Sequence, residues 1–300
     1  MLKLHAESVT LANGVTRRYG GHKVPCCAEC NAMLGARIEV PASRLLKAGY
    51  ARMREKLDSD GFQLLHAWAA LVFLKMHLKD SKMPWSLDNR MDAGKIGEVY
   101  SSDELHHIQS IVRTKLLEGW VEQEVRGTCF VHQASKTEFD QPFDYADNSR
   151  GCASMIRVGD QCIFNVFDDA SIVAAAINGL IARCGPLSSP QARELLTHLA
   201  YTNIRIVRRP RFWTNVFSGT PVIDGFVPEP YEIRRYVPSV WGSMLYHANR
   251  DHLEGVNVEE LKNGHWTYLL RDDGSFIETF KRAPTQSLAE TTHAAGMPER

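Results

Sequence analysis

The sequence predicts an α+β protein with a small N-terminal module, residues 1–58, and a larger mixed α+β domain, residues 59–282. Segments with apolar residues at helical spacing alternate with segments of β-type composition, which is typical of the α+β class. A β-hairpin signal lies in the middle of the chain. The turn-forming residues 58–61 interrupt the helical pattern and mark the boundary between the two parts.

Residues 43–57 are expected to form one amphipathic helix, with Ser43 as its N-cap after Pro41. Basic residues occupy its other faces, so the module ends in a basic helix. Its apolar face recurs at i, i+4, i+7 and i+11 and consists of Leu46, Tyr50, Met53 and Leu57.

The larger domain opens with residues 61–80, which are apolar on nearly all sides and predict a buried helix. A long loop is expected over 81–100, because Pro, Gly and Asp are frequent there. Ser101 and Glu104 form a capping-box pattern that begins the next helix, which ends at Gly119.

The middle of the chain is predicted to be mixed. Residues 120–133 have β-type composition, and Gly159-Asp160 is a two-residue hairpin signal between strands 153–158 and 161–167. A helix is expected over 168–186, with an acidic start and a Gly-Pro stop.

Towards the C-terminus we expect a helix over 188–201, with Ser189 as N-cap and Pro190 in the first helical position. A strand should follow within the stretch 202–213 and end at Pro210. The tail, residues 283–300, is rich in Ser, Thr, Ala and Pro and is predicted to be flexible.

Composition narrows the class of protein. No run of about 18 uncharged apolar residues suggests a membrane span, and the first ten residues do not resemble a secretory signal. Seven scattered cysteines, an odd number, favour a reduced cytoplasmic protein over a disulfide framework. Residues 1–58 hold ten Lys or Arg against five Asp or Glu, a net charge of +5, which is compatible with a polyanionic partner or with a solvated helix face.

Cys27 and Cys30 form a C-x-x-C pair, a spacing at which two thiolates can bind one zinc ion and fill half of a tetrahedral shell. No second C-x-x-C is present, because the other cysteines are isolated or adjacent to the pair. The same pair could be redox-active, although no βαβ pattern surrounds it, or could be a coincidence of spacing.

The surrounding residues resemble the second half of the HNH endonuclease motif, the ββα-metal finger. The resemblance is carried by Gly20-Gly21, His22, Val24-Pro25, the Cys27/Cys30 pair and Asn31, and it covers about 35 residues. It implies a partial ββα-metal module with a structural Zn²⁺ half-site at Cys27 and Cys30. It also implies catalytic roles for His22 and Asn31, which would hydrolyse phosphodiester bonds in DNA with Mg²⁺ or another divalent cation.

The chain departs from this family at its first strand, because no Asp-His or Glu-His pair precedes the paired glycines. It is similar also to uncharacterised bacterial HNH-like proteins, of which residues 9–19 match a spacer. On that comparison the chain begins just after the strand that carries the water-activating histidine. We therefore expect weak or no cleavage from the chain as it stands.

His66 and His77 are eleven residues apart and share a helix face with Phe73, near Asp80. This stripe could bind a second metal or act in acid–base chemistry. A buried helix whose histidines are hydrogen-bonded to neighbours would show the same pattern, and we favour that interpretation. The adjacent pair His106-His107 diverges by about 100° on a helix and does not suit one ligand.

Candidate DNA-binding residues are the helix cations Arg44, Lys47 and Arg52, together with Arg205 and Arg208, which precede Phe212 and Trp213. Charged residues and a proline are also common on ordinary edge strands, where they prevent pairing with another strand. Arg205 and Arg208 could therefore have this structural role instead of binding DNA. Asp168-Asp169 precedes a predicted helix and most simply interacts with its dipole.

Three functions remain open from the sequence. The first is an HNH-type endonuclease relative with an accessory domain, and the second is a non-catalytic zinc-knuckle module that binds nucleic acid or protein. The third is an incomplete gene product whose residues 1–40 are poorly ordered. In the first two cases the expected partner is DNA rather than a membrane.

Overall fold

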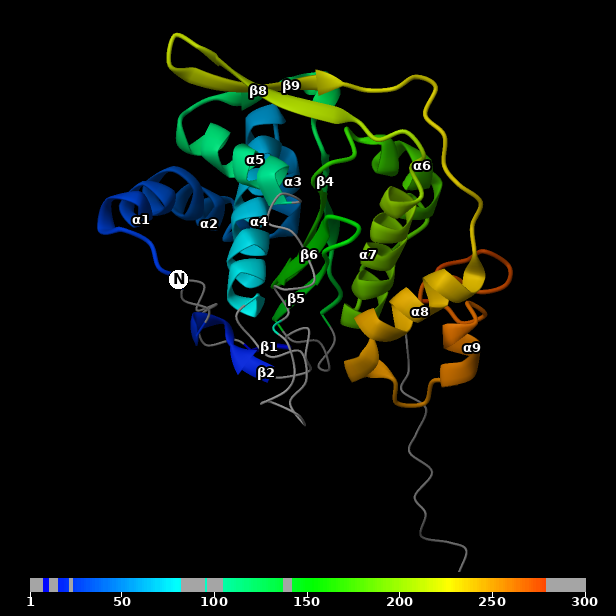
Figure 1. Ribbon diagram of the computed structural model, residues 1–300. Helices are drawn as coiled ribbons and strands as arrows, with labels where there is room; N and C mark the ends of the chain where they lie inside the picture. Colours follow the sequence, from blue (N-terminus) through cyan, green and yellow to red (C-terminus); the bar gives the residue numbers. More distant parts are fainter. Residues whose placement is uncertain are drawn as a thin grey trace, which may run out of the picture.

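The computed structural model describes residues 8–10, 16–21, 24–81, 95, 105–136 and 142–278. The protein belongs to the α+β class, as predicted from the sequence. Helices cover both faces of a four-stranded antiparallel sheet, and a three-stranded sheet lies at one end of the molecule (Figure 1).

The four-stranded sheet has the order β4-β7-β6-β5. Its central strands, β6 (Ala153–Val158) and β7 (Gln161–Val166), are buried at every residue because helices cover both faces. Gly159 and Asp160 connect them as a two-residue turn, with Gly159 at a φ of +61° and Val158 opposite Gln161, so the predicted hairpin is confirmed. The outer strands are β4 (Thr128–Gln133) and β5 (Phe143–Asn148).

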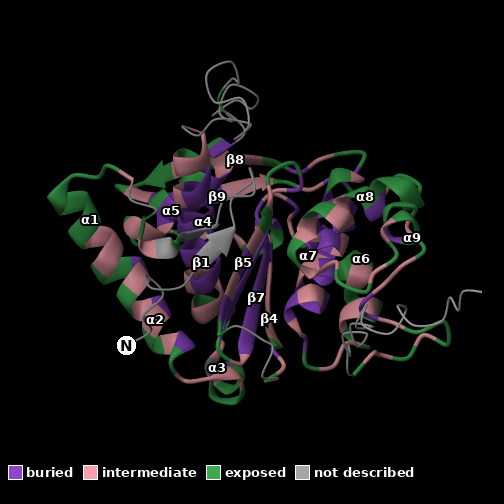
Figure 2. Cartoon of the chain, turned by 90° about the horizontal axis from the view of Figure 1, so that it is seen from below, coloured by how far each residue is buried: buried purple, intermediate pink, exposed green. Residues whose placement is uncertain are grey.

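One face of this sheet is covered by α4 (Ser59–Asp80), the predicted buried helix, and by α5 (His106–Leu116), which packs against it. The Asp58 side chain caps α4 by accepting the N–H of Gly61 at 2.8 Å. Phe73 of α4 is fully buried against sheet residues such as Ile156 and Ile163. Burial is deepest along α4 and the middle strands, and the surface of α1 is exposed (Figure 2).

The N-terminal helices are α1 (Ala28–Leu34), a π-helical turn (Gly35–Glu39), α2 (Val40–Leu46) and α3 (Tyr50–Lys56). The single helix expected over 43–57 is therefore wrong, and Ser43 lies inside α2 instead of capping it.

The break between α2 and α3 lies at Gly49, whose φ of +76° favours glycine. Asp160 of the β-hairpin accepts the N–H of Tyr50 at 3.1 Å and so caps α3 from outside. Met53 is nevertheless buried on the predicted apolar face, together with Leu46.

The core beneath α4 continues through the N-terminal helices. Buried residues on both sides of position 58 belong to one cluster, which includes Ile38, Ala42, Leu46 and Met53. The boundary predicted at 58 remains a prediction.

The other face of the four-stranded sheet is covered by α6 (Ile172–Ile181) and α7 (Ser189–Ile204), which pack on Met155 and Phe164. The predicted N-cap of α7 is wrong by one residue. Ser188 caps the helix instead, because its side chain and that of Gln191 form a reciprocal capping box, and Pro190 follows in the second helical position.

The strand expected within residues 202–213, with its end at Pro210, is wrong. Helix α7 continues to Ile204, and the strand β8 (Arg211–Phe217) begins only after Pro210. Helix packing decides this, because Tyr201, Thr202 and Asn203 are all buried. The order of the three-stranded sheet is β3-β9-β8, with β3 (Trp120–Val121) parallel to β9 (Thr220–Phe226).

The remaining elements pack on α7 or near the N-terminus. Helix α8 (Pro238–Ala248) and helix α9 (Val258–Lys262) form a small cluster with Tyr201. Strands β1 (Ser8–Thr10) and β2 (Thr16–Arg18) pair as a short hairpin. The predictions for His22, the box Ser101/Glu104 and the tail 283–300 lie outside the described residues, as does the predicted loop 81–100 apart from residues 81 and 95.

Candidate functional site

The cysteine pair lies at the exposed start of α1. Cys27 is the N-cap of this helix, with extended backbone angles, and its Sγ accepts the N–H of Cys30 at 3.2 Å. Cys26, Cys27 and Cys30 are exposed free thiols. Cys27, Cys30 and Asn31 stand at i, i+3 and i+4, so the local backbone places them on one face of the helix start.

Hydrogen bonding makes the pKa values of the Cys27 and Cys30 thiols unequal. The Cys30 side chain and N–H hydrogen-bond to the sulfur of Cys27 and lower the pKa of Cys27. The pKa of Cys30 is raised, first by that side-chain hydrogen bond and then by the charge of Cys27. A bound cation would remove the repulsion between two thiolates, so this arrangement favours metal binding over two free anions.

These residues fit half of a zinc shell. Two thiols one helical turn apart match the C-x-x-C arrangement of structural zinc sites. Within the described part of the chain, no group of three or more His, Cys, Asp or Glu could hold a metal ion together. The remaining two ligands would come from elsewhere, and His22 lies outside the described residues.

The helix cations predicted to bind DNA follow the cysteines along the chain. Arg44 and Lys47, at the end of α2, and Arg52 of α3 are exposed, and none of them forms an ion pair with another described residue. In contrast, Arg37 pairs with Glu118 at 3.4 Å. The free cations could therefore bind an anion without first breaking a pair.

Arg205 and Arg208 have structural partners. Arg205 donates to the carbonyl of Arg234 at 2.7 Å and lies over the rings of Tyr201 and Tyr236, and Arg208 donates to the carbonyl of Pro230 at 3.0 Å. They hold the segment 229–236 against the end of α7. Figure 1 shows this end of α7 across the sheet from α1 and α2, so the two predicted groups do not form one surface.

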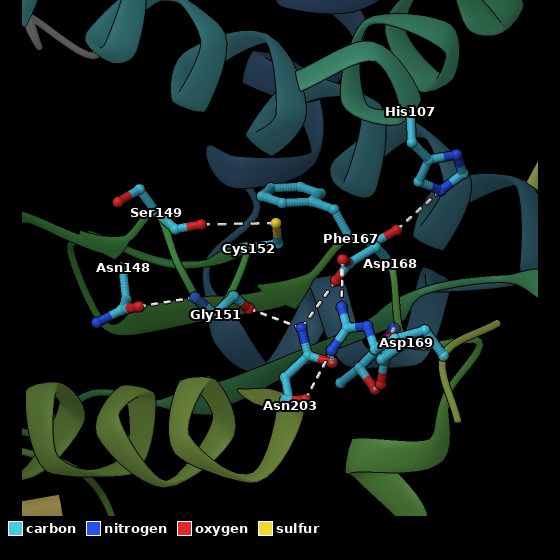
Figure 3. Close-up of polar contacts among 11 residues, drawn as sticks. His107, Asn148, Ser149, Gly151, Cys152, Phe167, Asp168, Asp169 and Asn203 are labelled. Carbon is cyan, nitrogen blue, oxygen red and sulfur yellow. Dashed lines mark hydrogen bonds and ion pairs between the residues drawn. The ribbon is translucent and has the colours of Figure 1, made fainter. Parts of the chain in front are cut away.

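Asp168 and Asp169 organise the end of β7 (Figure 3). Asp168 pairs with Arg209 and accepts from Asn203 at 2.8 Å.

Asp169 is fully buried and accepts the N–H of Val173 at 2.9 Å, which supports the predicted interaction with the start of α6. It also accepts the N–H and hydroxyl of Thr128 at 2.7 and 2.5 Å, and burial raises its pKa to about 6. These carboxylates serve local structure.

The predicted stripe of His66, His77 and Asp80 does not converge on one ligand. The eleven-residue spacing of the histidines amounts to about 16 Å along α4. The Nδ1 of His77 lies 2.9 Å from the carbonyl oxygen of Phe73, and the rings of these two residues stack on each other. His77 therefore fits the buried, hydrogen-bonded interpretation.

His66 instead lies near His107 of α5; burial lowers the pKa of His66 to about 4, and the charge of His107 adds to the lowering. Both histidines line one cavity of about 220 Å³ between α4, α5 and the start of β4. Sequence spacing could not reveal this pair, because the packing of α4 on α5 brings the two side chains together. The sequence feature that bore on His66 was the burial expected for residues 61–80.

No family model matches this chain, and neither a curated protein nor a solved structure matches it. Among the residues that the structure describes, no helix combines the length and apolar character needed to cross a membrane.

Proposed function

We propose that the protein is an HNH-endonuclease-like DNA-binding protein, in which Cys27 and Cys30 hold a structural zinc ion. The observation that supports it best is the exposed thiol pair at the start of α1, where one sulfur accepts the N–H of the other cysteine. The exposed cations Arg44, Lys47 and Arg52, which form no ion pair with another described residue, follow within two helices and would contact phosphates.

Hydrolysis of DNA is the catalytic form of this proposal. A divalent cation such as Mg²⁺ would supply the charge that stabilises a leaving phosphate oxygen. Asn31, exposed on the same helix face as the cysteines, is the described residue that would help to hold it, with His22 as the second catalytic residue.

A non-catalytic zinc-knuckle module that binds nucleic acid is the second candidate. It is favoured by the donor set of the described residues, in which no group of three or more His, Cys, Asp or Glu is placed to hold one metal ion. The two candidates share the DNA contacts and differ in cleavage.

Binding to a short fluorescent DNA duplex, measured by anisotropy over a range of salt concentrations, tests both candidates. We expect Arg44→Ala/Lys47→Ala/Arg52→Ala to weaken binding and to reduce the slope of log K against log salt by about 2 to 3, at roughly 0.9 per lost phosphate contact. The control is Arg150→Ala/Arg235→Ala/Lys262→Ala, which removes the same charge from other exposed positions.

Equal weakening by the two triple variants would mean that net charge, and not this surface, determines binding. Cleavage of the same duplex in the presence of Mg²⁺ separates the candidates. Cleavage that is lost in Asn31→Ala supports the nuclease, whereas binding without cleavage supports the module. Absence of DNA binding at low salt would contradict both.

A further inference from the structure

The outer face of the three-stranded sheet carries exposed aromatic side chains. Ile223 of β9 is buried in the core on the inner face, so the residues that alternate with it in the pleat point outward. Trp213 and Phe217 of β8 and Phe226 of β9 lie on the outer face and are 45%, 59% and 58% exposed. Val216, on the inner face close to the turn of the hairpin, is 66% exposed. The hairpin lies at one end of the molecule, beyond α5 (Figure 1).

The turn of this hairpin determines which backbone groups of β8 reach β9. Ser218 and Gly219 both have a positive φ, +51° and +86°, which is the signature of a type I′ turn, so Phe217 and Thr220 form a hydrogen-bonded pair. Hydrogen-bonded and non-bonded pairs alternate along an antiparallel ladder, so every second residue of β8 points its N–H and C=O away from β9. These outward-pointing residues are Phe212, Thr214 and Val216.

The other side of β9 agrees with this assignment. Ile223, which lies opposite Thr214, accepts the N–H of Glu122 at 2.9 Å, on the side of β9 that faces β3. Strand β8 is the last of its sheet, and after Arg211 it contains no charge, proline or bulge of the kind that protects an exposed edge. Such an edge is a template for pairing with another strand.

A second copy of β8 fits this edge best in one antiparallel register. With Thr214 opposite Thr214 of the second copy, Phe212 lies opposite Val216 and all three outward-pointing residues form hydrogen-bonded pairs. A shift of two residues in one direction would place Val216 opposite Pro210, which has no N–H, and a shift in the other would place Phe212 opposite the turn residue Ser218. The best register therefore has a two-fold axis at Thr214, as an isologous dimer requires.

The charge of β8 is also placed for pairing with itself. Arg211 is the one charged residue of the strand, and the two-fold axis keeps the two copies of it apart. In this register Arg211 lies opposite Phe217 of the second copy on one side and opposite Phe226 of its own β9 on the other. A guanidinium between two aromatic rings is favourable. Trp213 lies diagonal to Trp213 of the second copy, within the reach of aromatic side chains across a sheet.

The exposed apolar area suits the centre of a small dimer interface. At the exposed fractions given above, Trp213, Val216, Phe217 and Phe226 each leave on the order of 100 Å² in contact with solvent. Together they form an apolar centre of about 400 Å², within the roughly 800 Å² that each partner buries in a standard interface. An area of this size favours a reversible dimer over a permanent one.

We propose that the protein forms a two-fold dimer, in which the β8 strands of two copies pair antiparallel about Thr214 and join two three-stranded sheets into one sheet of six strands. The inference goes beyond the function proposed above. Its test involves neither zinc nor DNA, so its outcome is independent of that function.

Sedimentation equilibrium of the full chain, over a wide range of protein concentrations, tests the proposal. We expect the mass to rise with concentration from the 33.8 kDa of the monomer towards twice that value. Phe217→Lys places two cations opposite each other in the dimer, and should weaken dimerisation at least tenfold. The double variant Arg211→Glu/Phe217→Lys gives these facing positions opposite charges and should restore the dimer. The control Val240→Lys, at a 49% exposed residue of α8, should dimerise as the wild type does.

A backbone variant tests the paired edge itself. Thr214→Pro removes an outward-pointing N–H but no hydrogen bond between β8 and β9, so the hairpin should persist while the dimer weakens. Thr214→Ala keeps the N–H and should keep the dimer. A wild type that stays monomeric would overturn the proposal, whether or not the surface binds another partner such as a single-stranded oligonucleotide. Undiminished dimerisation of Phe217→Lys, or no recovery in the double variant, would also overturn it.

Discussion

At the residue scale, burial and hydrogen bonding determine what the titratable side chains can do. Cys27 is exposed and has a lowered pKa because Cys30 hydrogen-bonds to its sulfur. Cys129 shows the opposite case. Burial raises the pKa of its thiol to about 12, so this thiol is expected to be unreactive. The reactive or metal-binding thiols of the described chain are therefore expected at the start of α1.

The neutral His66 ring predicts a pH effect on stability. Its pKa of about 4 lies below the ordinary value of 6.5, so between these limits the unfolded chain binds more protons. Stability then falls as the pH falls through this window. Between pH 7 and pH 4 the wild type should lose about 3 kcal/mol more unfolding free energy than His66→Phe.

Urea denaturation at the two pH values measures this difference, and His106→Phe, at an exposed position, serves as the control. Identical losses in the wild type and His66→Phe would show that the buried ring is not responsible.

At the element scale, the connection between α2 and α3 depends on one glycine. Gly49 adopts a φ of +76°, and this left-handed conformation lets the chain turn so that Met53 reaches the core. The carboxylate of Asp160 completes the turn by accepting the N–H of Tyr50. This hydrogen bond between Tyr50 and Asp160 of the central hairpin thus helps to set the direction of α3.

Gly49→Ala should destabilise the protein by about 1–2 kcal/mol, because an L-residue is strained at this φ. The space around a Cβ there is adequate, with Asp160 at 3.6 Å, so strain and not a clash would be responsible. Gly179→Ala in the exposed part of α6 is the matched control and should stabilise by up to about 1 kcal/mol. Chemical denaturation of both variants measures the contrast, and a neutral Gly49→Ala would contradict it.

Local patterns in the sequence were sufficient for some elements. The turn at Gly159-Asp160 and the buried helix α4 follow from short-range chemistry and from uniform hydrophobicity. The break at Gly49 and the continuation of α7 to Ile204 depend on distant partners, since Asp160 caps α3 and sheet packing buries Asn203. The pairing of His66 with His107 has the same origin, and no periodicity within one helix encodes it.

At the scale of the whole molecule, a single core runs under α2, α3, α4 and α5. The basic N-terminal segment is therefore packed against the body through residues such as Ile38 and Met53, both with no exposed surface. A buried ion pair, Arg193 with Asp144 at 2.7 Å, ties α7 to β5 on the opposite side. We expect the described chain to unfold cooperatively.

Met53→Ala should lower the unfolding free energy by about 2–5 kcal/mol, since it removes a fully buried side chain from that core. Calorimetry should show one transition that moves to lower temperature as a whole. Lys47→Ala, at an exposed position between the same two helices, should leave the transition nearly unchanged. A separate early transition in Met53→Ala would instead show that the N-terminal helices unfold independently.

The proposed zinc site is tested most directly by the zinc content of the purified full chain, measured by mass spectrometry after removal of loosely bound metal. Cys27→Ser and Cys30→Ser are compared with Cys26→Ser, the adjacent exposed thiol. We expect stoichiometric zinc in the wild type and in Cys26→Ser, and its loss from each of the other two variants. A zinc-free wild type, or equal zinc in all three variants, would contradict it.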